Sequence, residues 1–179
     1  MNRPPETLSS AAVTLRRWRA ADAELSYRLI SESLDHLRPW MAWATDAYSL
    51  QSAQEYVERC EANWADGSAF QYLIVAQGQP AGSAGLMARI GTGGLEIGYW
   101  VHPSWTGRGV ATSAAGALTD AALALPEIER VEIHHDVLNA ASGRVPAKLG
   151  YSLIEEVPTD PDMIAPGDAG TSRVWRITR

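Results

Sequence analysis

The sequence predicts a mixed α/β domain, and three observations lead to that class. Several segments alternate apolar and polar residues, as half-buried strands do. Other segments repeat apolar residues at helical spacing and end at Gly or Pro. Finally, 46% of the 179 residues are hydrophobic, which is enough to bury one sizeable core. We therefore expect one domain over residues 1–179, with residues 1–12 flexible.

The N-terminal elements follow from alternation and capping. Residues 13–18 alternate apolar and polar side chains, which predicts the first strand. Asp22 offers an N-cap for a helix that ends near residue 33. A second helix is expected over residues 50–64, and its apolar stripe includes Cys60. Cys60 is therefore expected to be a small core residue rather than a nucleophile.

Turn residues organise the centre of the chain. A turn containing Gly and Pro separates two expected strands, 71–76 and 81–88. A third strand is expected over residues 95–101. An alanine-rich helix is expected over residues 110–125, because Pro126 ends it.

The last third of the chain alternates strands with one short helix, which ends at Gly150. The expected elements are strand 130–137, helix 139–149, strand 151–156 and strand 172–178. Residues 158–170 are rich in Pro, Gly and Asp and are predicted to form a mobile loop.

Composition and charge narrow the function classes. The net charge of −6 gives no support for nucleic-acid binding, which usually needs a basic face. The single cysteine excludes an internal disulfide and fits a reducing cytoplasm. The sequence shows no apolar run typical of a signal peptide or a membrane helix. A cytoplasmic protein without membrane or nucleic-acid partners is therefore expected.

The most informative motif is the glycine turn between the strand at 95–101 and the helix that follows. Gly107 and Gly109 permit tight curvature and the close approach of a ligand. Free backbone N–H groups and the helix dipole would meet at this turn, which favours an anion such as a pyrophosphate. The alternative is an ordinary loop before a helix.

Five short segments carry a resemblance to a known family. Residues 106–111 match the phosphate-binding turn of the GNAT superfamily of acyl-CoA-dependent N-acyltransferases, with Thr106 where Gln or Arg is usual. Residues 139–142 and 148–151 match a later motif of that superfamily. Residues 36–43, together with 96–101, resemble the RimJ/RimL type, which acetylates protein N-terminal amines. The resemblance implies the GNAT fold: a mostly antiparallel sheet of about seven strands flanked by about four helices and split near the cofactor site.

The resemblance also implies a set of residues that bind acetyl-CoA. The turn would hold the pyrophosphate, Val101 would offer its N–H to the thioester or the pantetheine, and Asn139 and Ser142 would lie near the sulfur. The implied cofactor-binding residues are Val101, Thr106, Gly107, Arg108, Gly109, Val110, Ala111, Thr112, Asn139 and Ser142. In many members, a tyrosine protonates the leaving thiolate, and this chain has Pro146 at the position of that tyrosine. Ser142 is therefore the residue expected to assist the leaving thiolate here.

Acyl transfer to an amine needs a group that removes the amine proton. Glu96 is the candidate base, and the alternative is an exposed strand carboxylate. His134 shares its strand face with Glu132 and Asp136. This face either relays protons or holds a cationic substrate, or it is merely solvated. No metal is expected, because His134 and His135 are adjacent on a strand and point to opposite faces.

Aromatic residues suggest where the acceptor would bind. Trp40 and Trp43 are predicted to line an acceptor pocket. The alternative is that both indoles only pack their loop onto the sheet. The carboxylates of the 158–170 loop either lie across the acceptor entrance or belong to a surface loop.

These features predict an acetyl-CoA-dependent N-acetyltransferase in which a primary amine attacks the thioester directly within a ternary complex. The expected acceptor is a protein or peptide N-terminal α-amine. A small-molecule amine, such as an antibiotic or an aminoacyl metabolite, is the alternative. A non-catalytic CoA-binding module is the second alternative, because of Pro146. A homodimer is plausible by resemblance.

Overall fold

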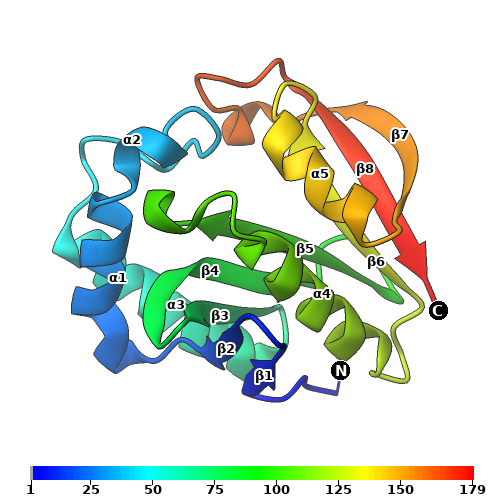
Figure 1. The fold of residues 1–179 in the computed structure, drawn as a ribbon, viewed down its shortest axis with the longest axis horizontal. Helices are drawn as coiled ribbons and strands as arrows, with labels where there is room; N and C mark the ends of the chain where they lie inside the picture. The colour runs from blue at the N-terminus through cyan, green and yellow to red at the C-terminus, as the bar shows by residue number, and fades with distance from the viewer. Residues whose placement is uncertain (1) are drawn as a thin grey trace.

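A single sheet of eight strands runs through the protein, in the spatial order β1-β2-β3-β4-β5-β6-β8-β7 (Figure 1). The computed structural model describes residues 2–179. The strands are β1 (Thr7–Ser9), β2 (Thr14–Arg17), β3 (Ala69–Ala76), β4 (Gln79–Met87), β5 (Gly94–Val101), β6 (Arg130–Asp136), β7 (Ser152–Pro158) and β8 (Thr171–Thr178).

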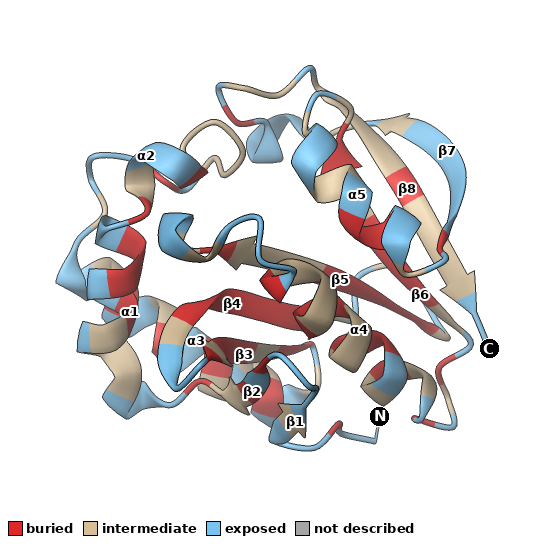
Figure 2. Ribbon diagram, viewed as in Figure 1, coloured by how far each residue is buried: buried red, intermediate tan, exposed pale blue. Residues whose placement is uncertain are grey.

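Five α-helices and short 3-10 turns connect these strands. The helices are α1 (Ala23–Ser31), α2 (Leu34–Leu37), α3 (Leu50–Asp66), α4 (Val110–Leu123) and α5 (Ala140–Lys148). Helix α3 lies behind the sheet in the view of Figure 1, and α4 lies in front of it. Helices α3 and α4 each turn their apolar side chains toward the sheet. Buried residues therefore line both faces of the sheet (Figure 2).

The two faces of the sheet carry separate clusters of buried side chains. On the α4 face, Leu118 packs with strand residues such as Leu95 and Ile133. On the face covered by α1 and α3, Trp18 packs with Leu73. Because side chains alternate along a strand, neighbouring residues of β5 contribute to opposite faces. This alternation separates Glu96 from its neighbours in the α4 cluster.

The sheet opens at its one parallel pair. Strands β5 and β6 pair only over four positions, from Gly94 with Arg130 to Ile97 with Ile133. Beyond Ile97, β5 continues beside β4, while β6 continues beside β8. The two strands therefore diverge (Figure 1), and the split leaves backbone groups of β5 without a neighbouring strand.

The predicted mixed, mostly antiparallel and split sheet is confirmed, with two differences. The sheet has eight strands rather than about seven, and there are five α-helices rather than about four. The extra strand, β1, lies within residues 1–12, and its three residues are too few to show a period. The extra helix, α2, is a single turn just before Pro39. Within residues 2–179, no helix combines the length and hydropathy that a membrane crossing requires.

Candidate active site

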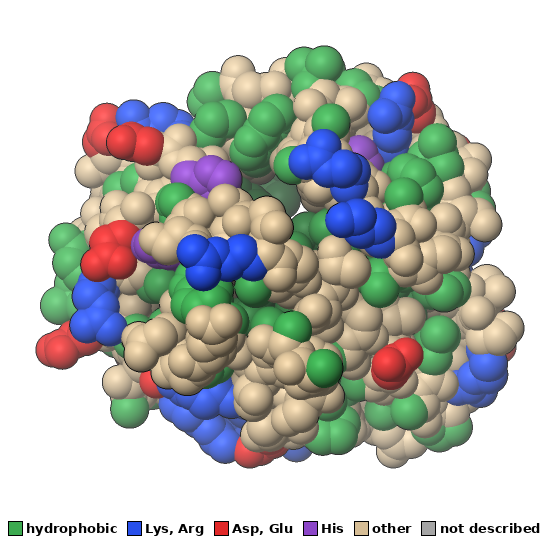
Figure 3. Space-filling model, viewed as in Figure 1, with side chains coloured by type: hydrophobic (Ala, Val, Ile, Leu, Met, Phe, Trp, Pro, Cys, Tyr) green, Lys and Arg blue, Asp and Glu red, His purple; other side chains and the backbone are tan. Residues whose placement is uncertain are grey.

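A cavity of about 1450 Å³ lies at the split between β5 and β6. Its walls come from α3, the starts of α4 and α5, the segment between α2 and α3, and the 158–168 loop. Figure 3 shows the surface hollowed there. The predicted site residues that line the cavity are Trp40, Trp43, Glu96, Val101, Thr106, Gly107, Gly109, Val110, Ala111, Thr112, His134, Asn139 and Ser142. Arg108 is the one predicted residue that does not line it.

The turn before α4 has the geometry of an anion cradle. Gly107 and Gly109 adopt φ angles of 72° and 76°, which residues other than glycine rarely adopt. A Cβ at either position would meet no protein atom within 4 Å, so the space above the turn is open to a ligand. The first turn of a helix leaves backbone N–H groups without partners in the helix. The turn therefore fits the pyrophosphate of a CoA.

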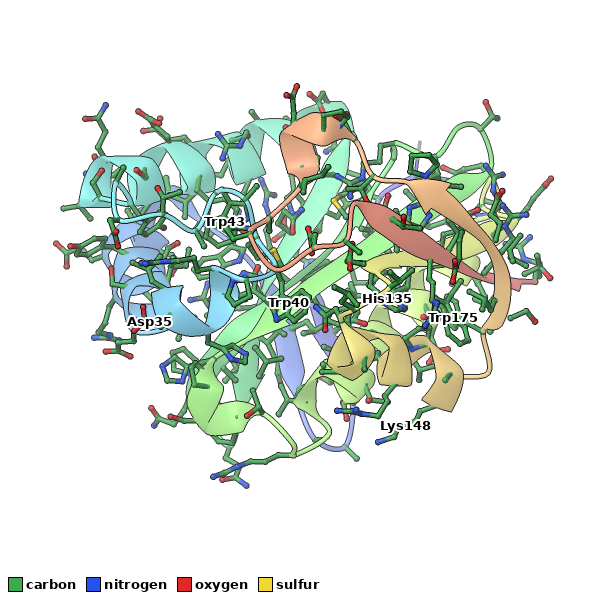
Figure 4. All side chains as sticks on the ribbon, turned by 90° about the horizontal axis from the view of Figure 1, so that it is seen from above. Asp35, Trp40, Trp43, His135, Lys148 and Trp175 are labelled. Atoms are coloured by element: carbon green, nitrogen blue, oxygen red, sulfur yellow. The ribbon has the colours of Figure 1, made fainter. Side chains whose placement is uncertain are left out.

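Cations gather at the same mouth of the cavity. Arg144 and Lys148 lie one turn apart on α5, and both line the cavity. Neither forms a salt bridge with any of residues 2–179. Figure 4 labels Lys148 on α5. Arg108 instead lies with its guanidinium over the Trp105 ring, 5.2 Å from the ring centroid. In a chain of net charge −6, such free cations suit a ligand that carries phosphates.

The end of β5 presents a free backbone donor. The His102 N–H bonds to the Ala81 carbonyl on the β4 side, at 2.9 Å. Because backbone N–H groups alternate between the two edges of a strand, the Val101 N–H points to the other edge, into the split. A donor fixed at this place can stabilise negative charge on a thioester carbonyl oxygen.

The start of α5 forms the facing wall. The Asn139 side chain caps the helix by accepting a hydrogen bond from the Ser142 N–H at 3.0 Å. The Tyr99 hydroxyl, from β5, reaches across to Ser142. It lies 3.0 Å from the Ser142 carbonyl oxygen and 3.1 Å from the Ser142 hydroxyl.

Glu96 lies inside the cavity wall rather than at an exposed strand position. It is 5% exposed, and its carboxylate accepts two hydrogen bonds from the Arg89 guanidinium, one of them at 2.8 Å. This bidentate pair fixes the orientation of the carboxylate. An oriented and buried carboxylate can accept a proton from an amine.

His134 lies between two carboxylates on the same sheet face. Its Nε2 donates to Glu132 at 2.8 Å, and its Nδ1 lies 3.9 Å from a Glu96 oxygen. Burial opposes ionisation of Glu132, but His134 and Arg176 hold the pKa of that carboxyl below its ordinary value. The face is therefore a charged network rather than a merely solvated surface.

The neighbouring His135 has a structural role, because both of its ring nitrogens are hydrogen-bonded within the protein. The Trp175 indole N–H donates to its Nε2 at 2.9 Å, so its Nδ1 carries the proton and donates to the Asp136 carbonyl (Figure 4). Burial lowers the pKa of His135, which keeps the ring neutral. No group of three potential metal ligands occurs within residues 2–179.

The loop after β7 closes over one side of the cavity. Asp136 accepts hydrogen bonds from the Leu138 and Ala169 N–H groups, both at 2.9 Å. Burial opposes its ionisation, but these N–H groups hold the pKa of Asp136 below its ordinary value. Asp136 thus lines the cavity and anchors the loop. At the far end of the loop, the Gly167 N–H donates to the Pro39 carbonyl at 2.8 Å and ties the loop to the opposite wall.

The aromatic wall of the cavity includes both predicted tryptophans. Trp40 and Trp43 lie on the segment between α2 and α3 (Figure 4). Trp43 is 43% exposed, and its ring lies 6.2 Å from the Tyr48 ring of the same loop. Cys60 also lines the cavity, but burial raises the pKa of its thiol to about 11. The thiol therefore stays neutral and is a poor nucleophile.

Sequence reasoning missed four residues at the cavity: Arg89, Tyr99, Arg144 and Lys148. The spacing of Arg144 and Lys148, four residues apart on an expected helix, was a usable signal for one shared face. Arg89 could be found only with the register that pairs Met87 with Glu96. The role of Tyr99 depends on contact with a helix 43 residues later, which no local pattern reveals.

The site combines a split sheet, a glycine cradle at the start of α4 and a buried carboxylate on the sheet face opposite α4. This combination defines an acyl-CoA-dependent acyltransferase of the GNAT class. The model of the acetyltransferase (GNAT) domain matches residues 12–152. The chain therefore belongs to the GNAT acetyltransferase family and is an acyltransferase.

Several known proteins are similar to this chain. One is "Putative ribosomal N-acetyltransferase YdaF" of Bacillus subtilis (strain 168), 28% identical over 145 residues that span 78% of this chain and 77% of YdaF. RimL, described as a ribosomal L7/L12 α-N-protein acetyltransferase in complex with coenzyme A, superposes with a TM-score of 0.87 at 22% identity, over 97% of this chain and 98% of RimL. The microcin C7 self-immunity acetyltransferase MccE, in complex with acetyl-CoA and AMP, gives a TM-score of 0.86 at 20% identity, over 95% of this chain and 94% of MccE. The last two likenesses show a shared fold.

Proposed function

We propose that this protein transfers an acetyl group from acetyl-CoA to the N-terminal α-amine of a protein or peptide. The observation that carries the proposal is the shared cavity. It joins the anion cradle at Gly107 and Gly109 to the buried carboxylate of Glu96 through the split in the sheet. A donor held at the cradle and an amine held at Glu96 would meet at the split.

The choice of donor is supported by the fit of the cradle and by the relatives. The open space above the glycines and the free cations of α5 match a pyrophosphate. RimL and MccE were each described with CoA or acetyl-CoA bound. When bound, acetyl-CoA supplies an acetyl group on a thioester carbon that an amine can attack.

The position of each residue then determines its role in acyl transfer. Glu96 accepts the proton of the amine, with His134 beside it to hold the ammonium form. The Val101 N–H donates to the carbonyl oxygen as negative charge develops there. The Ser142 hydroxyl, at the start of α5, donates to the sulfur as the carbon–sulfur bond breaks. A thiol of pKa near ~8.5 leaves readily, so Ser142 adds a modest gain. We propose direct attack in a ternary complex, because the cavity offers no reactive nucleophile.

The choice of a protein α-amine rests on the relatives. The names of YdaF and RimL both point to ribosomal protein acetylation. An α-amine has a pKa near ~7.7–8.0, so a single carboxylate with modest basicity suffices to deprotonate it.

A small-molecule amine is the second candidate, and one observation favours it. The bond between Gly167 and Pro39 closes the loop over the cavity, and Trp40 and Trp43 provide flat aromatic surfaces there. Such a roofed pocket suits a small ligand better than an open groove does. MccE, whose complex contains AMP, shares this fold.

The test is free-thiol release from acetyl-CoA across a panel of acceptors, with the products identified by mass spectrometry. The panel holds peptides that begin with Ala, Ser or Met, together with aminoglycosides, polyamines and aminoacyl nucleotides. Acetylation of a peptide α-amine supports the first candidate. Turnover of a small amine alone supports the second, and silence across the panel contradicts both.

A further inference from the structure

We infer that Tyr99 is a positioning residue for acyl transfer, which holds the Ser142 hydroxyl at the leaving sulfur. The inference rests on the proposed function. It starts from the contact between the Tyr99 hydroxyl and two oxygens of Ser142, at 3.0 Å and 3.1 Å. Both residues line the cavity at the split.

The reason for the contact is a proline inside α5. In a regular helix the N–H of residue 146 would bond to the carbonyl of residue 142. Pro146 has no N–H, so it cannot donate to the Ser142 carbonyl. The Tyr99 hydroxyl takes the place of that missing donor. Tyr99 therefore compensates for Pro146 across the split, from a different element of the fold.

The arrangement fixes the direction of both hydrogen bonds. A carbonyl oxygen can only accept, so the single phenolic hydrogen of Tyr99 goes to the Ser142 carbonyl. The Ser142 hydroxyl must then donate to the Tyr99 oxygen. Burial raises the pKa of Tyr99 to about 12, so the phenol stays protonated and its hydrogen stays in place. Tyr99 is thus a fixed support rather than a proton donor to the thiolate.

This support determines what Ser142 can do. In the free protein, the Ser142 hydroxyl donates its hydrogen to the Tyr99 oxygen, and Ser142 lines the cavity. As the carbon–sulfur bond breaks, the electron pair stays on sulfur, and the Ser142 hydrogen turns from Tyr99 to the sulfur without leaving Ser142. Tyr99 and Ser142 therefore act together at the split.

The first experiment is a double-mutant cycle in turnover, with Tyr99→Phe and Ser142→Ala. We expect Tyr99→Phe to lower kcat by about 3–10-fold and to leave the KM for acetyl-CoA within about twofold, which corresponds to one net hydrogen bond. In the Ser142→Ala background, the same change should cost less than about twofold, because its target is gone. Equal costs in both backgrounds would overturn the inference.

The second experiment separates a catalytic role from a structural one. Pro146→Ala restores an N–H that can reach the Ser142 carbonyl. Tyr99→Phe should lower the melting temperature by roughly 2–4 °C in the Pro146 protein and by less in the Pro146→Ala protein. Turnover of the double variant should remain low, since only the carbonyl has regained its partner. Recovery of kcat together with stability would show that Tyr99 serves the helix alone.

Tyr151→Phe is the matched control. Tyr151 is also a buried phenol, bonded to Thr119 at 2.7 Å, and burial raises its pKa to about 12. Its removal should lower the melting temperature but leave kcat unchanged. A wild-type protein that releases no thiol with any acceptor would contradict the proposed function and, with it, the role of Tyr99 in positioning Ser142. The melting-temperature cycle would still report whether Tyr99 satisfies the Ser142 carbonyl.

Discussion

Replacing Glu96 with Gln tests the proposed base, and the structure sets the size of the effect. Gln keeps the shape of Glu96 and can still accept a hydrogen bond from Arg89, but it cannot take a proton. General bases contribute about 10²–10⁴ to a rate. The low end applies here, because His134 lies only 3.9 Å from Glu96 as a partial substitute. We expect kcat/KM to fall about 100-fold at pH 7, which is about 2.7 kcal/mol.

The pH dependence of the variant carries a further test. About one in eight α-amines is free at pH 7, and more than nine in ten are free at about pH 9. The rate of Glu96→Gln, which depends on free amine, should therefore rise about eightfold over that interval. For a lysine acceptor the same arithmetic predicts a rise of about 100-fold. The wild type, which binds the ammonium form, should change little.

The assay is steady-state thiol release from about pH 6 to 9, the range in which the α-amine titrates. The KM for acetyl-CoA should be unchanged, because Glu96 lies on the sheet face opposite the Tyr99 and α5 contact. Asp22→Asn is the matched control, since Asp22 has the same bidentate bond to an arginine, Arg16, away from the cavity. Equal turnover of Glu96→Gln and the wild type across the whole range would refute the assignment.

Three further predictions follow from the walls of the cavity. Replacing both Arg144 and Lys148 with Ala should raise the KM for acetyl-CoA about tenfold and leave kcat within about twofold; initial rates at low and high salt will check this, since screening should weaken the wild type in the same way. Gly167→Ala should raise the KM for the acceptor severalfold without changing that for acetyl-CoA, because its Cβ would lie 2.6 Å from the Pro39 carbonyl oxygen and push the loop away; equal KM values would contradict this reading. The folded-state pKa of Asp136 is depressed, so its contribution to stability is complete above the unfolded value near ~3.9 and is lost as the pH falls through the folded value. Melting curves of Asp136→Asn should therefore show a loss of about 1–3 kcal/mol at neutral pH and a smaller difference from the wild type in acid.

The sequence predicted most of the fold because the elements are long and their ends are marked. Helix α4 begins after Gly109 and ends near Pro126, so both boundaries follow from local chemistry. Strand β1 was missed because it has only three residues, which are too few to show alternation. Its position depends on pairing with β2, a contact made in three dimensions.

The candidate site was predictable where it depends on backbone and less so where it depends on partners. The glycine cradle is encoded by residue types that permit positive φ, so Gly107 and Gly109 could be found directly. Glu96 could be named, but its burial and its bond to Arg89 depend on strand register. The functions of Asp136 and His135 also depend on partners from distant segments, the loop around Ala169 and Trp175.

The divergence of β5 and β6 also affects how the protein avoids aggregation. Unpaired strand edges attract other chains when they lie on the surface. Here the edge that offers the Val101 N–H lies inside the molecule, between two halves of one sheet, where a narrow ligand can enter and another folded chain cannot. The outer edges are protected differently: β1 is only three residues long, and β7 has a register irregularity, two glutamates and a terminal Pro158. The unpaired backbone groups of β5 are therefore accessible to a ligand but not to another protein chain.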